Sequence, residues 1–126
     1  MATHIEGVSH LDWQELKDVL SDGERAAIVI DVREPEEYEE AHIGGLPLIP
    51  MGDIIDWPEK LDPQREYVFV CRSGRRSLEV AKYFQNNGFA NVHNFLGGML
   101  SWVAEGCDVA GGPAEPIESY GLDVKP

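Results

Sequence analysis

The chain has 126 residues and a formal net charge of −13, and 43% of its residues are hydrophobic and 26% are charged. These values are typical of a soluble globular protein, and the length fits one domain with a substantial core. The excess of acidic residues argues against nucleic acid or an anionic membrane as a partner, because both are polyanions that would repel the chain.

Strand and helix patterns alternate along the chain, as expected of an α/β fold with a parallel sheet. Residues 8–11 are a short strand or the approach to the first helix, where Asp12 and Glu15 resemble a capping box. Within the strand predicted over 46–49, Pro47 favours the sheet edge. Hydrophobic spacing predicts further strands over 26–32, 67–70 and 91–95, and helices or helical turns over 13–20, 34–41, 51–61, 77–87 and 99–105.

The most informative segment runs from Tyr67 to Gly88. Residues 67–70 form an apolar run that indicates a strand buried on both faces, and Cys71 follows it directly. A loop with three arginines and one glycine comes next, Arg72-Ser73-Gly74-Arg75-Arg76, and a helical pattern begins at Ser77. A thiol is therefore expected between the carboxyl end of a buried strand and the amino end of a helix.

This position has consequences for the chemistry of Cys71. The first turn of a helix presents unpaired N–H groups and about half a positive charge, so the loop can hold an anion with its backbone amides. The same field, together with the three arginines, favours the thiolate over the thiol. Cys71 is therefore a candidate nucleophile with an anionic reaction partner. The alternative is a small buried hydrophobic residue that ends a strand.

Asp31 and Arg33 lie at the carboxyl end of the strand predicted over 26–32. In an open α/β sheet this edge binds ligands, so both residues are expected near Cys71. Two roles are open for them, a direct role at the site or a salt bridge that attaches the strand to the following loop.

Three motifs, in this order, resemble the rhodanese (sulfurtransferase) family. The sequence CRSGRRS at residues 71–77 resembles the family's active-site loop, and the segments DVR at 31–33, EY at 37–38 and AHIGG at 41–45 resemble its upstream motif. The sequence GGMLSW at residues 97–102 resembles its G-G-x-x-x-W motif. Ala41 stands where the family commonly has glycine, and Gly44 where it commonly has proline. These differences affect the expected local turn and not the expected chemistry.

The resemblance implies a single rhodanese-like domain over residues 1–126, with a core of about 8–106 and an irregular tail over 107–126. Its fold class is α/β, an open parallel sheet with helices on both faces. The implied activity is transfer of sulfane sulfur from thiosulfate or another persulfide donor to cyanide or a thiol, through a persulfide on Cys71. No metal and no cofactor are expected. The expected partners are a small anionic sulfur donor and a thiol or cyanide acceptor, with thioredoxin among the candidates.

The loop is expected to bind the substrate and the persulfide through Arg72, Ser73, Gly74, Arg75, Arg76 and Ser77. Arg76 is the favoured ligand for the donor's oxyanion, because it lies at the entrance of the helix. In the family, the residues that match Asp31 and Arg33 support the site structurally.

Two other functions are weighed against sulfur transfer. Phosphatases and arsenate reductases that use a cysteine have the spacing Cys-x5-Arg, but Ser77 occupies that arginine position and the arginine lies one residue earlier, at Arg76. A non-catalytic rhodanese-like binding module often lacks the cysteine, whereas this chain keeps Cys71 within a cationic loop.

The other candidate residues have mainly structural interpretations. His42 is expected to be a hydrogen-bonded structural imidazole, Trp102 a core residue, and Cys107 a thiol without a motif around it, although a redox role as a resolving thiol stays open. With only two cysteines and no segment resembling a signal peptide or a membrane span, a reduced, cytoplasmic setting is expected.

Overall fold

The computed structural model describes residues 3–122. Its elements in chain order are β1 (Thr3–Ile5), β2 (Val8–Leu11), α1 (Trp13–Ser21), β3 (Ile28–Asp31), α2 (Pro35–Glu40), α3 (Met51–Ile54), β4 (Tyr67–Val70), α4 (Arg75–Gln85), β5 (Val92–Phe95), α5 (Gly98–Ala104) and the 3-10 helix η1 (Ile117–Tyr120). Within these residues, no helix has the length and apolar character needed to cross a bilayer.

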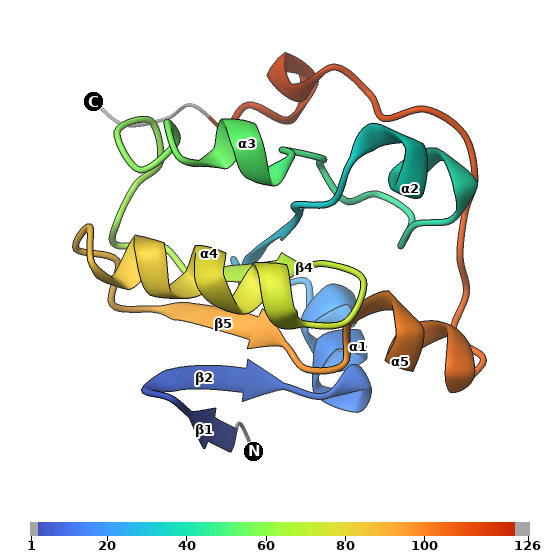
Figure 1. Cartoon of the computed structure of the whole chain (residues 1–126), viewed down its shortest axis with the longest axis horizontal. Helices are drawn as coiled ribbons and strands as arrows, with labels where there is room; N and C mark the ends of the chain where they lie inside the picture. Colours follow the sequence, from blue (N-terminus) through green and yellow to red (C-terminus); the bar gives the residue numbers. More distant parts are fainter. Residues whose placement is uncertain (1–2, 123–126) are drawn as a thin grey trace.

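The strands form one sheet in the order β1-β2-β5-β4-β3. The pairs β2–β5, β5–β4 and β4–β3 are parallel, and only the edge strand β1, which the sequence did not predict, runs antiparallel to its neighbour. In Figure 1 the arrowheads of β2, β4 and β5 point to the same side of the molecule, where α2 and α5 lie. The expected α/β fold with a parallel sheet is therefore confirmed, apart from the antiparallel edge strand β1.

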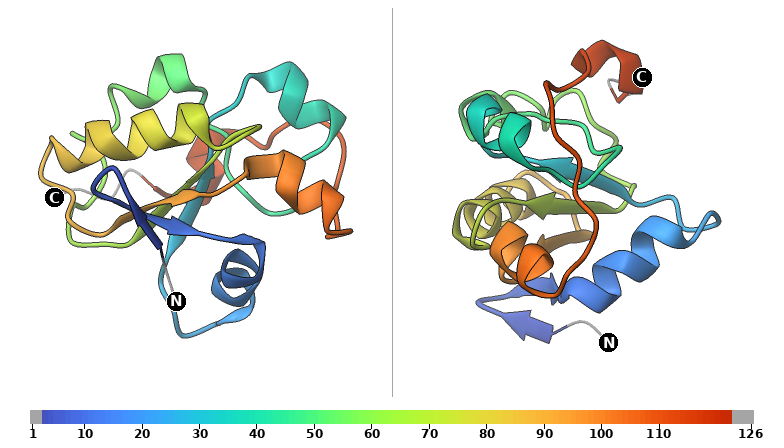
Figure 2. Two further views of the ribbon diagram at one scale, coloured as in Figure 1. Left: turned by 60° about the horizontal axis from the view of Figure 1, so that its bottom comes forward. Right: turned by 90° about the vertical axis from the view of Figure 1, so that its right-hand side faces the viewer.

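Apolar side chains cover both faces of the sheet, and Figure 2 shows α1 and α4 on opposite sides of it. On the α4 face, Phe84 packs against Phe69 and Phe89, with ring centroids 4.8 Å apart in each pair. On the other face, Leu16 of α1 and Trp102 of α5 belong to a second buried cluster. The interior strand β4 is buried along its whole length because its alternating side chains contribute to both clusters.

Several local expectations are confirmed, and others are corrected. The capping box of α1 is present, with Asp12 and Glu15 each accepting a hydrogen bond from the other's backbone N–H. The strand expected over 46–49 is wrong: only Leu48 forms a bridge, to Asp31. Pro47, just before it, lacks the N–H group that would extend the ladder towards the start of β3. The helix expected within 51–61 covers only Met51–Ile54, and α4 begins at Arg75 rather than at Ser77.

The segment after α5 is more ordered than expected. Ala110 forms an antiparallel bridge with His42, and Gly112 donates a hydrogen bond to the carbonyl of Glu39. Farther on, Ile117 of η1 and Leu122 pack against the cluster on the α4 face. The part of the expected irregular tail over residues 123–126 lies outside the described residues.

We expect Phe84→Ala to lower the free energy of unfolding by about 3–5 kcal/mol, because the substitution removes a fully buried ring between two aromatic neighbours. The control is Glu79→Ala on the exposed side of the same helix, which should change it by less than about 0.5 kcal/mol. Urea unfolding followed by circular dichroism measures both values. Equal losses in the two variants would contradict the assigned packing of α4.

Candidate active site

Cys71 lies where β4 ends, and its side chain is fully buried. Its Sγ accepts hydrogen bonds from the backbone N–H of Gly74 at 3.1 Å, the backbone N–H of Ser77 at 3.3 Å and the Ser77 hydroxyl at 3.2 Å. Burial alone would disfavour a charged sulfur, but hydrogen bonds to the charged form stabilise it. The loop and the first turn of α4 therefore form a site suited to an anionic sulfur, as the position of Cys71 predicts.

The amino end of α5 holds the loop on its other side. The backbone N–H of Met99 donates to the carbonyl of Cys71 at 2.9 Å, and that of Leu100 donates to the carbonyl of Arg72 at 3.0 Å. This approach requires Gly98, which has a φ of +56°. A Cβ atom there would lie 2.5 Å from the carbonyl oxygen of Cys71 and 2.6 Å from the backbone of Arg72. The G-G-x-x-x-W motif thus has a direct structural role at the loop.

Gly74 is a second position where the loop requires glycine. Its φ is +93°, and a Cβ atom would lie 3.1 Å from the backbone nitrogen of Gly97 and 3.2 Å from the carbonyl oxygen of Phe95. The curl that this conformation produces leaves several backbone N–H groups without a protein acceptor among residues 3–122, those of Arg72, Ser73, Arg75 and Arg76. These groups are available to an anionic ligand.

The three arginines of the loop differ in their surroundings. Arg76 forms a two-point ion pair with Glu37 of α2, with N–O distances of 2.8 and 2.9 Å. The hydrogen bond from Arg76 is the main cause that lowers the pKa of Glu37 to about 2. Arg72 and Arg75 are exposed, and within residues 3–122 neither side chain has an ion-pair or hydrogen-bond partner. The uncompensated positive charge of the loop therefore comes from Arg72 and Arg75.

Asp31 and Arg33 form a buried salt bridge. The Nη2 of Arg33 donates to Oδ2 of Asp31 at 2.8 Å and to the carbonyl of Ala41 at 2.8 Å. Asp31 is paired in register with Val70, the residue before Cys71. The structure thus brings the pair to the sheet edge that carries Cys71, and it shows the salt bridge that attaches β3 to the following segment.

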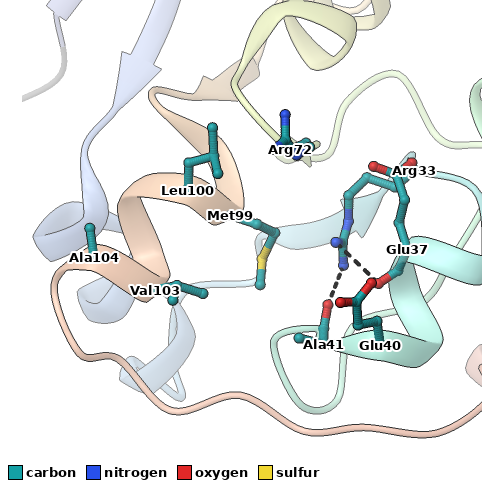
Figure 3. Close-up of a pocket in the computed structure, with 9 residues that line it drawn as sticks. All are labelled: Arg33, Glu37, Glu40, Ala41, Arg72, Met99, Leu100, Val103 and Ala104. Atoms are coloured by element: carbon teal, nitrogen blue, oxygen red, sulfur yellow. Dashed lines mark hydrogen bonds between the residues drawn. The ribbon is translucent and has the colours of Figure 1, made fainter.

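A pocket of about 390 Å³ opens next to the loop, between α2 and α5 (Figure 3). Arg72 lies on one side of it, and Arg33, Glu37 and Glu40 lie on the other. The apolar part of its wall comes from α5, including Leu100. Cys71 is buried and does not line the pocket, but its neighbour Arg72 does.

Other residues singled out in the sequence have structural surroundings. His42 is buried, stacks on Tyr38 with ring centroids 3.8 Å apart, and its Nδ1 lies 2.7 Å from the Tyr38 carbonyl. Trp102 is buried as expected, and Cys107 is a free thiol that packs against the cluster of α1 and α5. Among residues 3–122, no three His, Cys, Asp or Glu side chains are grouped so as to hold a metal ion.

Sequence reasoning missed Asn94 and His10, two buried polar residues that are connected to Cys71 through Ser77. The sequence could have indicated both residues, because each is a polar residue within a short and largely buried strand. Neither residue belongs to a motif of the sequence.

We expect Gly98→Ala to lower the free energy of unfolding by about 2–4 kcal/mol, because the added Cβ atom meets the backbone of Cys71 and Arg72. The matched control is Gly88→Ala. Gly88 also has a positive φ, of +90°, but open space around its Cβ position, so only the backbone cost of about 1–2 kcal/mol is expected. Urea unfolding measures the difference, and a smaller loss in Gly98→Ala than in Gly88→Ala would contradict the close approach.

We expect the ion pair of Glu37 to contribute to stability at neutral pH and to be lost in acid. The pKa of Glu37 is about 2 in the folded protein against an ordinary 4.5, so the contribution is complete above about pH 4.5 and disappears as the pH falls through about 2. Because both partners are partly exposed, its size is about 1 kcal/mol. Chemical unfolding at a series of pH values should show a shallower acid loss in Glu37→Gln than in the wild type. The control Glu36→Gln, on the exposed side of α2, should keep the wild-type slope.

Comparisons with known proteins identify the family of this chain. The family model of the rhodanese-like domain matches residues 12–105. YtwF of Bacillus subtilis is 51% identical over 77 residues, 61% of this chain and 74% of YtwF, and the thiosulfate sulfurtransferase GlpE of Coxiella burnetii is 31% identical over 98 residues, 77% of this chain and 86% of GlpE. The crystal structure of a rhodanese-like domain protein from Staphylococcus aureus superimposes with a TM-score of 0.69 at 32% identity, covering 81% of this chain and 98% of that one. The chain therefore belongs to the rhodanese-like domain family.

Proposed function

We propose that this protein is a sulfurtransferase that carries sulfane sulfur as a persulfide on Cys71. The observation that supports this most is the set of three donors around the Sγ of Cys71, two backbone N–H groups and the Ser77 hydroxyl. Such donors stabilise a charged sulfur before and after the reaction. The relative named thiosulfate sulfurtransferase, which matches over 77% of this chain, supports thiosulfate as the donor to be tested first.

In the first step, the Cys71 thiolate attacks the outer sulfur of thiosulfate. A sulfur–sulfur bond forms at Cys71 while the bond inside thiosulfate breaks, and sulfite leaves with the electron pair. The terminal sulfur of the new persulfide carries the negative charge. The backbone N–H groups that lack protein acceptors, those of Arg72, Ser73, Arg75 and Arg76, are the proposed donors to this charge.

In the second step, an acceptor attacks the terminal sulfur and the Cys71 thiolate is released. With cyanide the product is thiocyanate, and with a thiolate it is the persulfide of that thiol. Small thiols and thioredoxin are both proposed as acceptors, because either supplies a thiolate nucleophile. The pocket beside Arg72 is the proposed path of approach. Neither step requires a metal or a cofactor.

The ion pairs lead us to revise the roles of the arginines. Arg76 is held by Glu37, and the resulting pair is less available to a donor than an unpaired guanidinium. Its charge still acts on the sulfur, since interaction with Cys71 is a lesser cause, after Glu37, of the raised pKa of Arg76. We therefore propose that Arg72 and Arg75 bind the oxyanion end of the donor and that Arg76 stabilises the thiolate. Because Cys71 is fully buried, groups that cover its sulfur must move before the donor can reach it.

A direct test is the intact mass of the pure, reduced protein after incubation with thiosulfate. We expect a gain of about 32 Da, one sulfur atom, that cyanide removes with formation of thiocyanate. The gain should be absent in Cys71→Ser and retained in Cys107→Ser, the matched control at the second free thiol.

If neither thiosulfate nor an organic persulfide adds sulfur to the reduced protein, sulfur transfer is contradicted. Hydrolysis of an aryl phosphate that depends on Cys71 would then support the phosphatase alternative. Inactivity in both assays would support a binding module.

A further inference from the structure

A chain of buried polar side chains leads from Cys71 across the sheet. The Ser77 hydroxyl lies 3.2 Å from the Sγ of Cys71 and 2.5 Å from Oδ1 of Asn94. The Nδ2 of Asn94 contacts the Nδ1 of His10 at 3.2 Å, and the Nε2 of His10 contacts the carbonyl of Ile5 at 3.3 Å. Ser77, Asn94 and His10 are at most 2% exposed. The proposed reaction gives no role to Asn94 or His10.

The outer contacts of this row of polar side chains determine where its protons lie. The carbonyl of Ile5 only accepts, so the Nε2 of a neutral His10 carries the proton and its Nδ1 accepts. The carbonyl of Gly74, 3.0 Å from Nδ2 of Asn94, also only accepts. Both neighbours therefore require the amide nitrogen of Asn94 on their side. Its carbonyl oxygen Oδ1 must then face Ser77, as the short contact between them shows.

The Ser77 hydroxyl has one proton and two neighbours that can receive it. Beside a neutral thiol, the hydroxyl donates to Oδ1 of Asn94, and its oxygen is free to accept the S–H of Cys71. Beside a thiolate or a persulfide, which accept and do not donate, the hydroxyl forms a hydrogen bond with sulfur only if it turns away from Asn94. Oδ1 of Asn94, a residue only 1% exposed, then loses its partner, and an unpaired buried acceptor is unfavourable.

We propose that Asn94 is a positioning residue that competes with Cys71 for the hydroxyl proton of Ser77, and thereby limits how much of Cys71 is ionised in the resting protein. His10 and Gly74 keep the amide of Asn94 in the competing orientation. The inference rests on the proposed function only in taking Cys71 as the reacting thiol. It assigns to a residue 23 positions away from Cys71 a measurable effect on the charge of the sulfur.

The charged groups around Cys71 are not part of the hydrogen-bonded row of Ser77, Asn94 and His10. Arg72, Arg75 and Arg76 belong to the loop and α4, Glu37 to α2, and the Asp31–Arg33 pair to β3 and the segment after it. Within residues 3–122, His10 is the one ionisable side chain in hydrogen-bond contact with Asn94. A substitution at Asn94 therefore leaves the ion pairs of the site in place.

The test is the ratio of thiolate to thiol at Cys71, measured from the ultraviolet absorbance of the thiolate as a function of pH. Cys107→Ser is used throughout so that only one thiol titrates. We expect Asn94→Ala to raise the ratio at a given pH roughly fivefold, because the hydroxyl is freed for sulfur, and Ser77→Ala to lower it by a similar factor. In the Ser77→Ala background, Asn94→Ala should have no effect, since Asn94 acts through that hydroxyl. A lower ratio in Asn94→Ala, or equal changes in both backgrounds, would overturn the inference.

A second measurement uses the unsubstituted amide and so does not depend on how well the Asn94 variant folds. The side-chain carbonyl carbon of Asn94 is followed by NMR in the Cys107→Ser protein while Cys71 titrates. Its chemical shift should change with the same midpoint as the thiolate absorbance, and Cys71→Ala should abolish the change. The exposed Asn91, just before β5, is the internal control and should not respond. A constant Asn94 shift would overturn the inference. Neither measurement uses a sulfur donor, so a failure of sulfur transfer gives a different result from a failure of this inference.

Discussion

Two hydrogen bonds from the amino end of α5 determine the direction of the peptide groups after Cys71. They attract the carbonyls of Cys71 and Arg72 towards Met99 and Leu100. In a trans peptide the N–H points opposite to the carbonyl, so the amides of Arg72 and Ser73 point away from α5. Gly98 permits the approach because a side chain there would meet the loop backbone. The environment of the sulfur therefore depends on a contact between two motifs that lie far apart in sequence.

The site favours an anion within a protein whose net charge is −13. Two ion pairs lie around the loop, Asp31 with Arg33 and Glu37 with Arg76, and within residues 3–122 only Arg72 and Arg75 of the loop arginines keep an unpaired charge. Backbone dipoles act over short distances and are fixed by the fold, so they stabilise charge at one point without a change in the overall field. This arrangement explains how an acidic chain can contain a site for negatively charged sulfur.

The sequence predicted the fold class and the position of Cys71, because both depend on local patterns: an apolar run, a glycine in a cationic loop and a helical repeat. The strand expected at 46–49 is wrong because Pro47 has no N–H group to extend the single bridge at Leu48. The Arg76–Glu37 pair joins residues 39 positions apart, and the contact of Asn94 with His10 spans 84. Such pairs depend on strand register and helix packing, which no local pattern in the sequence specifies.

The segment that follows α5 is part of the packed domain, although it lies beyond the family model. The family model stops at residue 105, but ordered contacts continue to Leu122. The bridge from Ala110 attaches this segment to His42, and the hydrogen bond from Gly112 attaches it to Glu39 of α2. Farther on, Ile117 packs against the buried cluster on the α4 face. A domain boundary drawn from sequence similarity is thus shorter than the unit that packs together. A shortened version of this domain for fusion or crystallisation would need to include residues 106–122.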